Sequence, residues 1–352
     1  MEHIQSKINM LRCPDCHFNT IMLESSEFLK CENCNEKYYI LNENSANLLA
    51  NKNMSTTKRD IQRFWGDTCK QWYNAFDEKL DRNELEKHLQ YMEEMFSYRK
   101  HLAVTEMELE TLQGLDVLEI GSGGGAHSAL FQKYGANVIS IDITPERVLS
   151  TSKKLSLLNG SKGVAFLADA ENLPFNNESF DIVYSNGVLH HSENTEKCVE
   201  EVYRVLKPNA KAILMLYSRY SAHYWLNLFV KGVLTRAIFQ YPEYEWLGRI
   251  TEGKPVYGET RNPVTRVYSR RQLVSLFKKY KIISLRKYGF DFGQLPIIGK
   301  YKIRTSLLKL LGHKPHPGGI IVYGVPRLCG TTMLEFFLSQ FIGYNWAIVV
   351  KK

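Results

Sequence analysis

The chain has 352 residues, 44% of them hydrophobic, and a formal net charge of +8, which is enough apolar material for one large domain with appendages. No charged segment followed by an apolar one opens the sequence, and the longest apolar stretch, 334–350, is interrupted by polar residues. A secretory leader and a membrane-spanning helix are therefore not expected, and the sequence predicts a globular, cytoplasmic protein.

Four of the seven cysteines form two Cys-x-x-Cys pairs, Cys13 with Cys16 and Cys31 with Cys34. Fourteen residues separate the pairs, close to the spacing that places four thiolates around zinc. Four thiolates leave no open coordination position, so a structural ion is predicted rather than a catalytic one. His17 is an alternative fourth ligand, and a redox dithiol is the rival interpretation. We expect a zinc-ribbon-like domain over residues 1–45.

The next segment, residues 46–110, is predicted to contain a linker and a helical region. Residues 43–56 are polar and rich in asparagine, which is typical of a linker. Apolar residues then recur at helical spacing from Ile61, and a second helical pattern covers residues 85–110.

Residues 117–125 read Val-Leu-Glu-Ile-Gly-Ser-Gly-Gly-Gly, a short apolar strand that breaks into a glycine-rich loop. Glycine allows the main chain to contact a ligand without an intervening Cβ, and a helix expected from Ala126 points its free N–H groups at the same place. A second strand, 137–142, ends in Asp142 about 20 residues beyond the loop, where a carboxylate can accept hydrogen bonds from both hydroxyls of a ribose.

Two further strand ends carry polar residues. Residues 164–175 contain Asp169 after an apolar run, and residues 179–191 contain Asn186 and end in His190 and His191. Four successive strands that end in this way line one crevice of a parallel sheet. The sequence therefore predicts one ligand site at the carboxyl edge of these strands.

These segments resemble the class I S-adenosylmethionine (SAM) dependent methyltransferases, in particular methyltransferase type 11 enzymes of the ubiquinone/menaquinone type. The resemblance covers about residues 95–220 and includes the glycine loop, Asp-Ala-x-x-Leu-Pro-Phe from Asp169, Phe-Asp-x-Val from Phe180, and Val-Leu-His-His at 188–191. It implies an α/β fold with a Rossmann-like, seven-stranded sheet. It also implies that Asp142 binds the ribose, that Asp169 binds the adenine amino group beside Ala170, and that the glycine loop holds the methionine part.

SAM carries a sulfonium and an ammonium group, which favour nearby carboxylates, and Glu119 at the end of the first strand is our candidate for that role. The loop departs from the dinucleotide spacing, because Ala126 stands where a third glycine would fall. The residues expected to bind the cofactor are Glu119, Gly121, Ser122, Gly123, Gly125, Asp142, Ile143, Asp169, Ala170 and Asn186.

Methyl transfer needs a base only when the acceptor bears a proton. His191 and His190 at the fourth strand end are the candidates, with His223 as a third, although His190 also suits a packing role. In related enzymes the helix before the first strand covers the cofactor. Aromatic residues at helical spacing suit such a lid but also suit a core: Trp65, Trp72, Phe96 and Tyr98.

The remaining pattern completes a methyltransferase domain over residues 111–352. We expect a helix at 196–206, a strand at 210–217, an aromatic-rich substrate cap at 218–270, and a helix at 271–280. Strands at 281–288 and 346–350 follow, and the stretch between them, 291–345, is a long insertion. Its Gly-Gly-Ile-Ile-Val-Tyr-Gly segment, 318–324, has no role that the sequence assigns.

Positive charge is concentrated at the end of the chain. Residues 261–352 carry 17 Lys and Arg against two acidic residues, a net of +15, which leaves −7 for the rest. Such a region suits an anionic partner: a phosphorylated acceptor, RNA or an acidic membrane surface. One cluster lies at the end of the cap: Arg261, Arg266, Arg270 and Arg271.

Three functions fit the sequence. The first is methylation of a small-molecule or lipid- or carrier-linked acceptor, because the crevice motifs match that group of enzymes and an aromatic cap suits an organic acceptor. The second is RNA methylation, supported by the ribbon and the basic region. The third is a non-catalytic SAM-fold protein that binds another protein.

Overall fold

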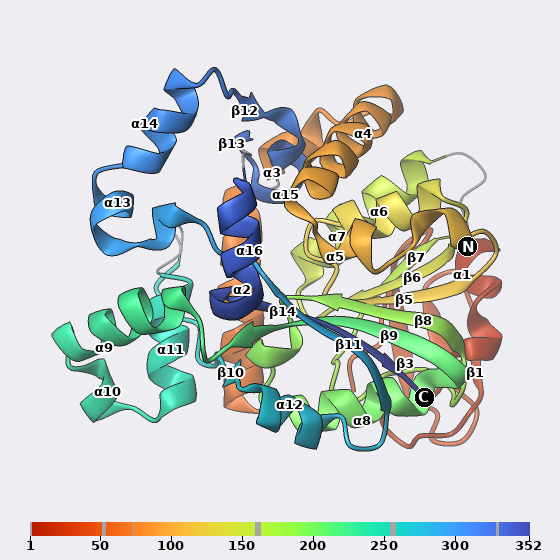
Figure 1. Ribbon diagram of the computed structural model, residues 1–352. Coiled ribbons are helices and arrows are strands. Elements are labelled where there is room, and N and C mark those ends of the chain that lie inside the picture. Colours follow the sequence, from red (N-terminus) through yellow and green to blue (C-terminus); the bar gives the residue numbers. More distant parts are fainter. Residues whose placement is uncertain (1, 51–53, 73, 159–162, 254–257, 329–330) are drawn as a thin grey trace.

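A computed structural model describes the chain apart from residues 1, 51–53, 73, 159–162, 254–257 and 329–330 (Figure 1). The centre of the molecule is a sheet with the strand order β1-β2-β3-β4-β7-β6-β5-β8-β9-β14-β11, and the short β10 (Val267–Tyr268) pairs with β9. Among the described residues, no helix is long and apolar enough to cross a bilayer.

The predicted seven-stranded Rossmann-like sheet is confirmed. Strands β7 (Val164–Leu167), β6 (Asn137–Asp142), β5 (Asp116–Ile120), β8 (Phe180–Asn186) and β9 (Leu206–Ser218) run parallel. Strand β14 (Asn345–Lys351) lies antiparallel between β9 and β11 (Lys281–Tyr288). Strands β5 to β8 are almost entirely buried, as expected for a parallel sheet covered on both faces.

Helices cover both faces of this sheet. One hydrophobic cluster joins it to α4 (Arg82–Arg99), α6 (Ala126–Lys133) and α7 (Pro145–Leu157). A second joins the other face to α8 (Thr195–Val205) and α12 (Arg270–Leu276). The helix predicted over 85–110 ends earlier, at Arg99, because Lys100 adopts a left-handed conformation, and the short α5 (Leu102–Thr105) follows.

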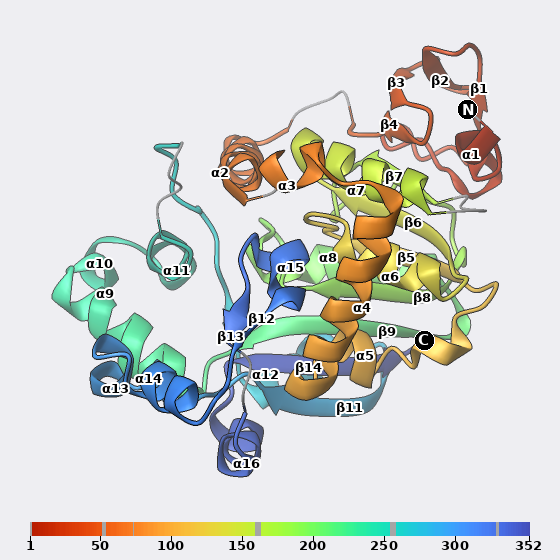
Figure 2. The ribbon, with the colours of Figure 1, turned by 90° about the horizontal axis from the view of Figure 1, so that it is seen from above.

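The amino-terminal segment is not a separate body. Strands β1 (Ile21–Leu23), β2 (Phe28–Cys31) and β3 (Lys37–Asn42) are followed by β4 (Ser45–Asn47), which pairs in parallel with β7. The Asn44 side chain donates to the carbonyls of Ser152 and Gly163 at 3.1 and 3.3 Å. The prediction of a linker from residue 43 is therefore wrong at β4, where the ribbon extends the main sheet (Figure 2).

Two insertions lie beyond the carboxyl edge of the sheet. The cap contains η4 (Tyr224–Phe229), α9 (Val230–Leu234), α10 (Ala237–Gln240) and α11 (Glu243–Thr251). The second insertion contains α13 (Pro296–Lys300), α14 (Ile303–Leu310), α15 (Ile320–Tyr323), α16 (Met333–Ile342) and the paired β12 (Pro315–His316) and β13 (Arg327–Leu328).

The second insertion folds back onto α4. A Cβ added at Gly318 would lie 2.1 Å from the carbonyl oxygen of Tyr91, so only glycine permits this approach. The helix that follows, α15, thereby reaches the carboxyl edge of the sheet (Figure 2). The segment without an assignable role in the sequence thus brings a distant part of the chain to the predicted crevice.

Candidate active site

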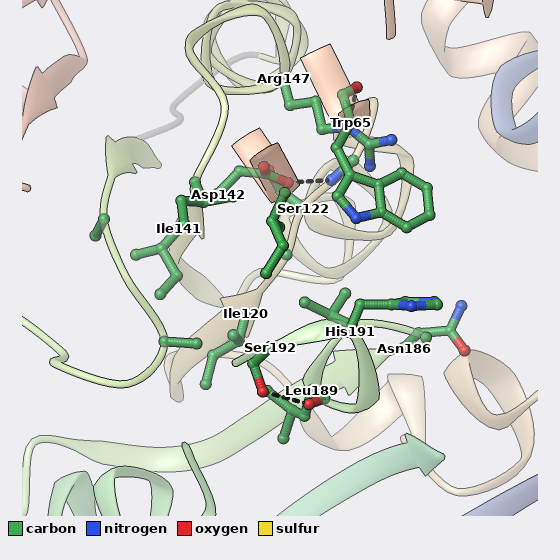
Figure 3. A pocket seen from close by; sticks show the side chains of 18 of the residues that line it. Trp65, Ile120, Ser122, Ile141, Asp142, Arg147, Asn186, Leu189, His191 and Ser192 are labelled. Carbon is green, nitrogen blue, oxygen red and sulfur yellow. Dashed lines mark hydrogen bonds between the residues drawn. The ribbon is translucent and has the colours of Figure 1, made fainter. Parts of the chain in front are cut away.

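A pocket opens at the carboxyl ends of β5, β6, β7 and β8 (Figure 3). Its walls are the loops 120–124, 141–143, 168–171 and 186–189, joined by side chains of α2 (Thr56–Trp72) and α15. The structure brings eight of the ten predicted cofactor residues together here: Gly121, Ser122, Gly123, Asp142, Ile143, Asp169, Ala170 and Asn186.

The other two predicted cofactor residues, Gly125 and Glu119, are not among the lining residues. Gly125 begins α6 at a φ of +77°, and a Cβ there would lie 2.6 Å from Thr151 Cα, so this glycine permits close helix packing. Glu119 is only 1% exposed, accepts a hydrogen bond from the Ser128 hydroxyl, and lies 3.3 Å from His127 Nδ1. Because His127 does line the pocket, Glu119 faces it only through that ring.

The turn at Gly121 is closely packed. Its φ is +77°, and an added Cβ would lie 2.2 Å from a methyl group of Val188. Both the backbone conformation and the contact exclude a side chain at this position.

Asp142 is fixed at the pocket by three hydrogen bonds. Its Oδ2 accepts from the Gly123 amide at 3.1 Å, and its Oδ1 accepts from the amide and hydroxyl of Thr144 at 3.0 and 2.9 Å. A carboxylate has about four acceptor positions, so one remains on Oδ2 for a ligand. The same contacts hold the glycine loop against the end of β6.

Asp169 contacts a cation that the sequence did not single out. Its Oδ1 accepts from the Glu171 amide at 2.9 Å, and its Oδ2 lies 2.5 Å from Nζ of Lys58 on α2. Lys58 Nζ is also 3.0 Å from Glu171 Oε2. Burial lowers the pKa of Lys58, but its contacts with Asp169 and Glu171 outweigh that effect and raise the pKa above its ordinary value. An ion pair therefore connects helix α2 to Asp169, the residue predicted to bind adenine.

His191 is 3% exposed and lines the pocket. The carbonyl of Val264, the amide nitrogen of Asn262 and the hydroxyl of Thr265 each lie 3.0 Å from its Nδ1. The carbonyl can only accept, whereas an amide can be turned over and a hydroxyl rotated, so we assign the proton to Nδ1 and a lone pair to Nε2. Burial lowers the pKa of His191 to about 4, so the ring is neutral at pH 7.

A carboxylate lies near Nε2 of this ring. Glu252 Oε1 lies 3.8 Å from His191 Nε2 and 3.3 Å from the Tyr217 hydroxyl. Burial raises the pKa of Glu252 above its ordinary value. Both Glu252 and the groups around Nδ1 belong to the predicted cap. None of the described residues of the cap lines the pocket, but they position one lining residue, His191.

The other two histidine candidates do not line the pocket. His190 is fully buried, its ring centre lies 3.9 Å from that of Tyr217, and burial lowers its pKa well below the ordinary value. His223 packs with its ring centre 4.8 Å from that of Tyr344, and burial lowers its pKa as well. The packing role weighed for His190 fits this placement.

Of the four aromatic residues that were candidates for a lid, Trp65 of α2 lines the pocket. Its ring centre lies 5.1 Å from that of His191 and 5.0 Å from the Arg147 guanidinium. Phe96 is buried in the core, Tyr98 is exposed, and the side chain of Trp72 lies outside the described residues.

Besides Lys58, the lining residues without a distinct sequence signal include Arg147, Ile321 and Val322. Arg147 lies on α7, five positions after Asp142, and Ile321 and Val322 belong to α15. The predicted arginine cluster is not at the pocket wall: Arg261, Arg270 and Arg271 are exposed, and Arg266 donates to the carbonyls of Ser192 and Glu193 at 2.6 and 2.8 Å. Arg266 thus holds the cap against a pocket loop.

The four predicted metal ligands meet in the ribbon. The Sγ atoms of Cys13, Cys16, Cys31 and Cys34 all lie within 4.8 Å of one another, with Cys13–Cys34 and Cys16–Cys31 at 3.6 Å. Four sulfurs bound at zinc's usual distance of about 2.3 Å would be about 3.8 Å apart, so the cluster has the right size. Tyr38 places its hydroxyl 3.0 Å from Cys13 Sγ, and among the described residues His17 is not part of the cluster.

Residues 118–214, which include the four strand ends that line the pocket, match a family described as "Methyltransferase domain". These residues form a methyltransferase domain. The chain is 36% identical over 100 residues to the uncharacterized methyltransferase YcgJ of Bacillus subtilis, covering 28% of this chain and 39% of that protein.

Two relatives have more specific names. A demethylmenaquinone methyltransferase of Clavibacter sepedonicus is 31% identical over 115 residues, 32% of this chain and 46% of that protein. A phthiotriol/phenolphthiotriol dimycocerosates methyltransferase of Mycobacterium leprae is 34% identical over 111 residues, 31% of this chain and 38% of that protein. The chain therefore spans less than half the length of each of these three relatives.

Proposed function

We propose that this protein is a SAM-dependent methyltransferase that acts on a small-molecule or lipid- or carrier-linked acceptor. The observation that carries the proposal is the pocket itself. It joins an open glycine loop, Asp142 and Asp169 at one sheet edge to a neutral imidazole, His191, on the adjoining wall. The residues that match the methyltransferase domain, 118–214, include the ends of β5, β6, β7 and β8, which form this pocket.

The residues present fit SAM. Among the described residues, the buried Oδ1 of Asn186 has no hydrogen-bond partner, and it belongs to the pocket wall beside the glycine loop. An unpaired buried carbonyl oxygen is costly and suits the ammonium of a methionine group. Asp142 and Asp169 offer carboxylates to ribose hydroxyls and to an adenine amino group respectively.

When bound, SAM would be held by the glycine loop, Asp142, Asp169 and Asn186, and it would supply an activated methyl group on a sulfonium that becomes a neutral thioether after transfer. The acceptor's lone pair forms the new bond to the methyl carbon, and the acceptor loses one proton. His191 Nε2 takes that proton, and the imidazolium so formed lies beside Glu252, whose carboxylate stabilises its charge. Trp65 shields the same space from water, which favours attack by an aligned and desolvated acceptor.

Two observations support a small-molecule or lipid- or carrier-linked acceptor: the apolar side chains of the pocket wall and the names of two relatives. Trp65, Ile321 and Val322 present apolar surface opposite the strand ends, which suits an organic acceptor better than a phosphate backbone. The two relatives with specific names act on demethylmenaquinone and on phthiotriol or phenolphthiotriol dimycocerosates, as their names state.

We further propose that the cysteine cluster holds one structural zinc ion. All four thiolates would coordinate the ion, which leaves no position for chemistry. The ribbon core is continuous with the strands next to the adenine position, so the ion would stabilise that edge of the sheet. No redox step is needed for this role.

The test is to incubate the protein with methyl-labelled SAM and cell extract, and then to separate RNA, protein and organic-soluble fractions. Label in the organic-soluble or small-molecule fraction supports the proposal. Label in RNA would favour the alternative acceptor class. Absence of transfer, together with SAM binding by calorimetry, would favour a non-catalytic binding protein.

A further inference from the structure

Three helical segments at one side of the molecule turn an apolar stripe toward solvent. In α14, the exposed residues Ile303, Leu307, Leu310 and Leu311 follow the i, i+4, i+7, i+8 pattern of a single helix face. Leu310 and Leu311 are 83% and 74% exposed. Such a stripe normally packs on the core, but here the buried residue of the helix is Leu308, which lies beside the stripe.

The same pattern recurs in the cap and in α16. In η4 and α9 the exposed residues are Leu226, Val230, Val233 and Leu234, again at i, i+4, i+7 and i+8. In α16 they are Met333, Leu334, Phe337 and Phe341. Three independent helices with outward apolar stripes indicate a docking surface rather than scattered exposed residues.

Specific contacts tie these helices together. The Asn227 side chain in η4 donates to the carbonyl of Gln294, just before α13, at 2.6 Å. Arg304 of α14 pairs with Glu335 of α16 at 2.6 Å. In Figure 2, α9 lies at the left of the molecule, α13 and α14 at the lower left and α16 at the bottom, all away from the amino-terminal strands β1 to β4 at the upper right.

The charges on these helices have one sign. In residues 221–240 and 296–342 the only acidic residue is Glu335, which is buried against Arg304. Within the described part of the chain, six exposed cations of these stretches have no carboxylate within 4.0 Å: Lys231, Arg236, Lys300, Lys302, Lys309 and Lys314. A surface that combines apolar side chains with cations alone is complementary to anionic lipid headgroups above an acyl layer.

We propose that this surface docks the protein on an anionic lipid bilayer, with α9, α14 and α16 lying in the headgroup region. The inference is independent of the proposed function, because it concerns how the chain is positioned and not what it methylates. A second copy of the chain fits less well, because like charges would face each other across the contact. RNA fits less well because ten of the twelve side chains in the three stripes are aliphatic, which leaves only Phe337 and Phe341 of these twelve for base stacking.

The test is sedimentation of the full chain with vesicles of phosphatidylcholine alone and of equimolar phosphatidylcholine and phosphatidylglycerol. We expect binding to the anionic vesicles that weakens as salt is raised. Neutralising three lysines in Lys300→Gln/Lys302→Gln/Lys309→Gln should weaken binding about 100-fold, since each cation near an anionic surface contributes about 1 kcal/mol. A matched variant elsewhere, Lys79→Gln/Lys197→Gln/Lys281→Gln, should bind nearly as well as the unaltered chain.

A second variant tests the apolar part. Leu310→Ser/Leu311→Ser should weaken vesicle binding roughly tenfold or more, because two inserted leucine side chains are lost. Both positions are exposed, so the fold should be retained, and methyl transfer to a water-soluble acceptor should not change. The proposal is overturned if the chain sediments with neither vesicle, or if both lysine variants lose binding equally. It is also overturned if sedimentation velocity shows a dimer that only the Leu310/Leu311 variant abolishes.

Discussion

Lys58 and Asp169 form an ion pair of 2.5 Å between helix α2 and the end of β7, although 111 positions separate them in the chain. The helix that places Trp65 over the pocket is thus anchored to the carboxylate that we expect to bind adenine. The second oxygen of Asp169 accepts one hydrogen bond from a described residue, the Glu171 amide at 2.9 Å, so acceptor capacity remains for a ligand. The ion pair is one of several contacts that hold α2 over the pocket; another is the hydrogen bond that Gln62 Nε2 donates to the Ile143 carbonyl at 2.7 Å.

Removing the Lys58 cation should make cofactor release faster. In Lys58→Met, α2 loses one of its anchors, so we expect S-adenosylhomocysteine to dissociate roughly tenfold faster, with a smaller change in its association rate. Lys58→Arg keeps the charge and should remain close to the unaltered protein. Stopped-flow fluorescence of Trp65 provides the measurement, and an unchanged dissociation rate in Lys58→Met would refute the anchoring role.

Asp142 should determine cofactor affinity. Replacing it by alanine removes the acceptor for ribose hydroxyls and also releases the Gly123 amide. Hydrogen bonds to a charged group are worth about 1.5 to 3 kcal/mol, so SAM affinity should fall by between about tenfold and well over a hundredfold. Calorimetry measures the change, and circular dichroism controls for folding. Equal affinity in Asp142→Ala and the unaltered chain would place the ribose elsewhere.

His191 should act as a base whose titration lies below the ordinary histidine range. Burial lowers its pKa to about 4, so the neutral, active form persists as the pH falls from 8 to 6 and is lost only as the pH approaches 4. For an acceptor that must lose a proton, His191→Asn should reduce kcat about a hundredfold or more. His223→Asn, a histidine outside the pocket, is the matched control and should retain activity. A rate that halves near pH 6.5 would contradict the assignment.

The ribbon should unfold together with the rest of the chain. We expect elemental analysis of the unaltered protein to give about one zinc per chain, and we expect Cys31→Ser to lose this metal ion. Because β4 pairs with β7 and the ribbon side chains share a core with the sheet, the variant should lower the temperature of one common unfolding transition. Cys69→Ser lies outside the cluster and should keep its metal. Full metal content in Cys31→Ser would exclude the cluster as the site.

Much of the candidate cofactor site could be predicted from local sequence. The glycine loop, Asp142, Asp169 and Asn186 each directly follow an apolar strand, and parallel strands bring such ends to one edge. Glu119 shows the limit of this reasoning. It stands one residue before the lining residue Ile120, and alternate residues of a strand face opposite sides, so its carboxylate points to Ser128 and His127 behind the loop.

Sequence alone therefore determined the fold class, the four cysteines that meet and the strand ends that form the crevice, because each depends on short-range spacing and on hydrophobic pattern. Only the tertiary structure decided that Ser45–Asn47 joins the main sheet, that Lys58 reaches Asp169, and that α15 closes the pocket. These contacts join segments far apart in the chain, and they depend on how whole elements pack. No local residue pattern encodes that packing.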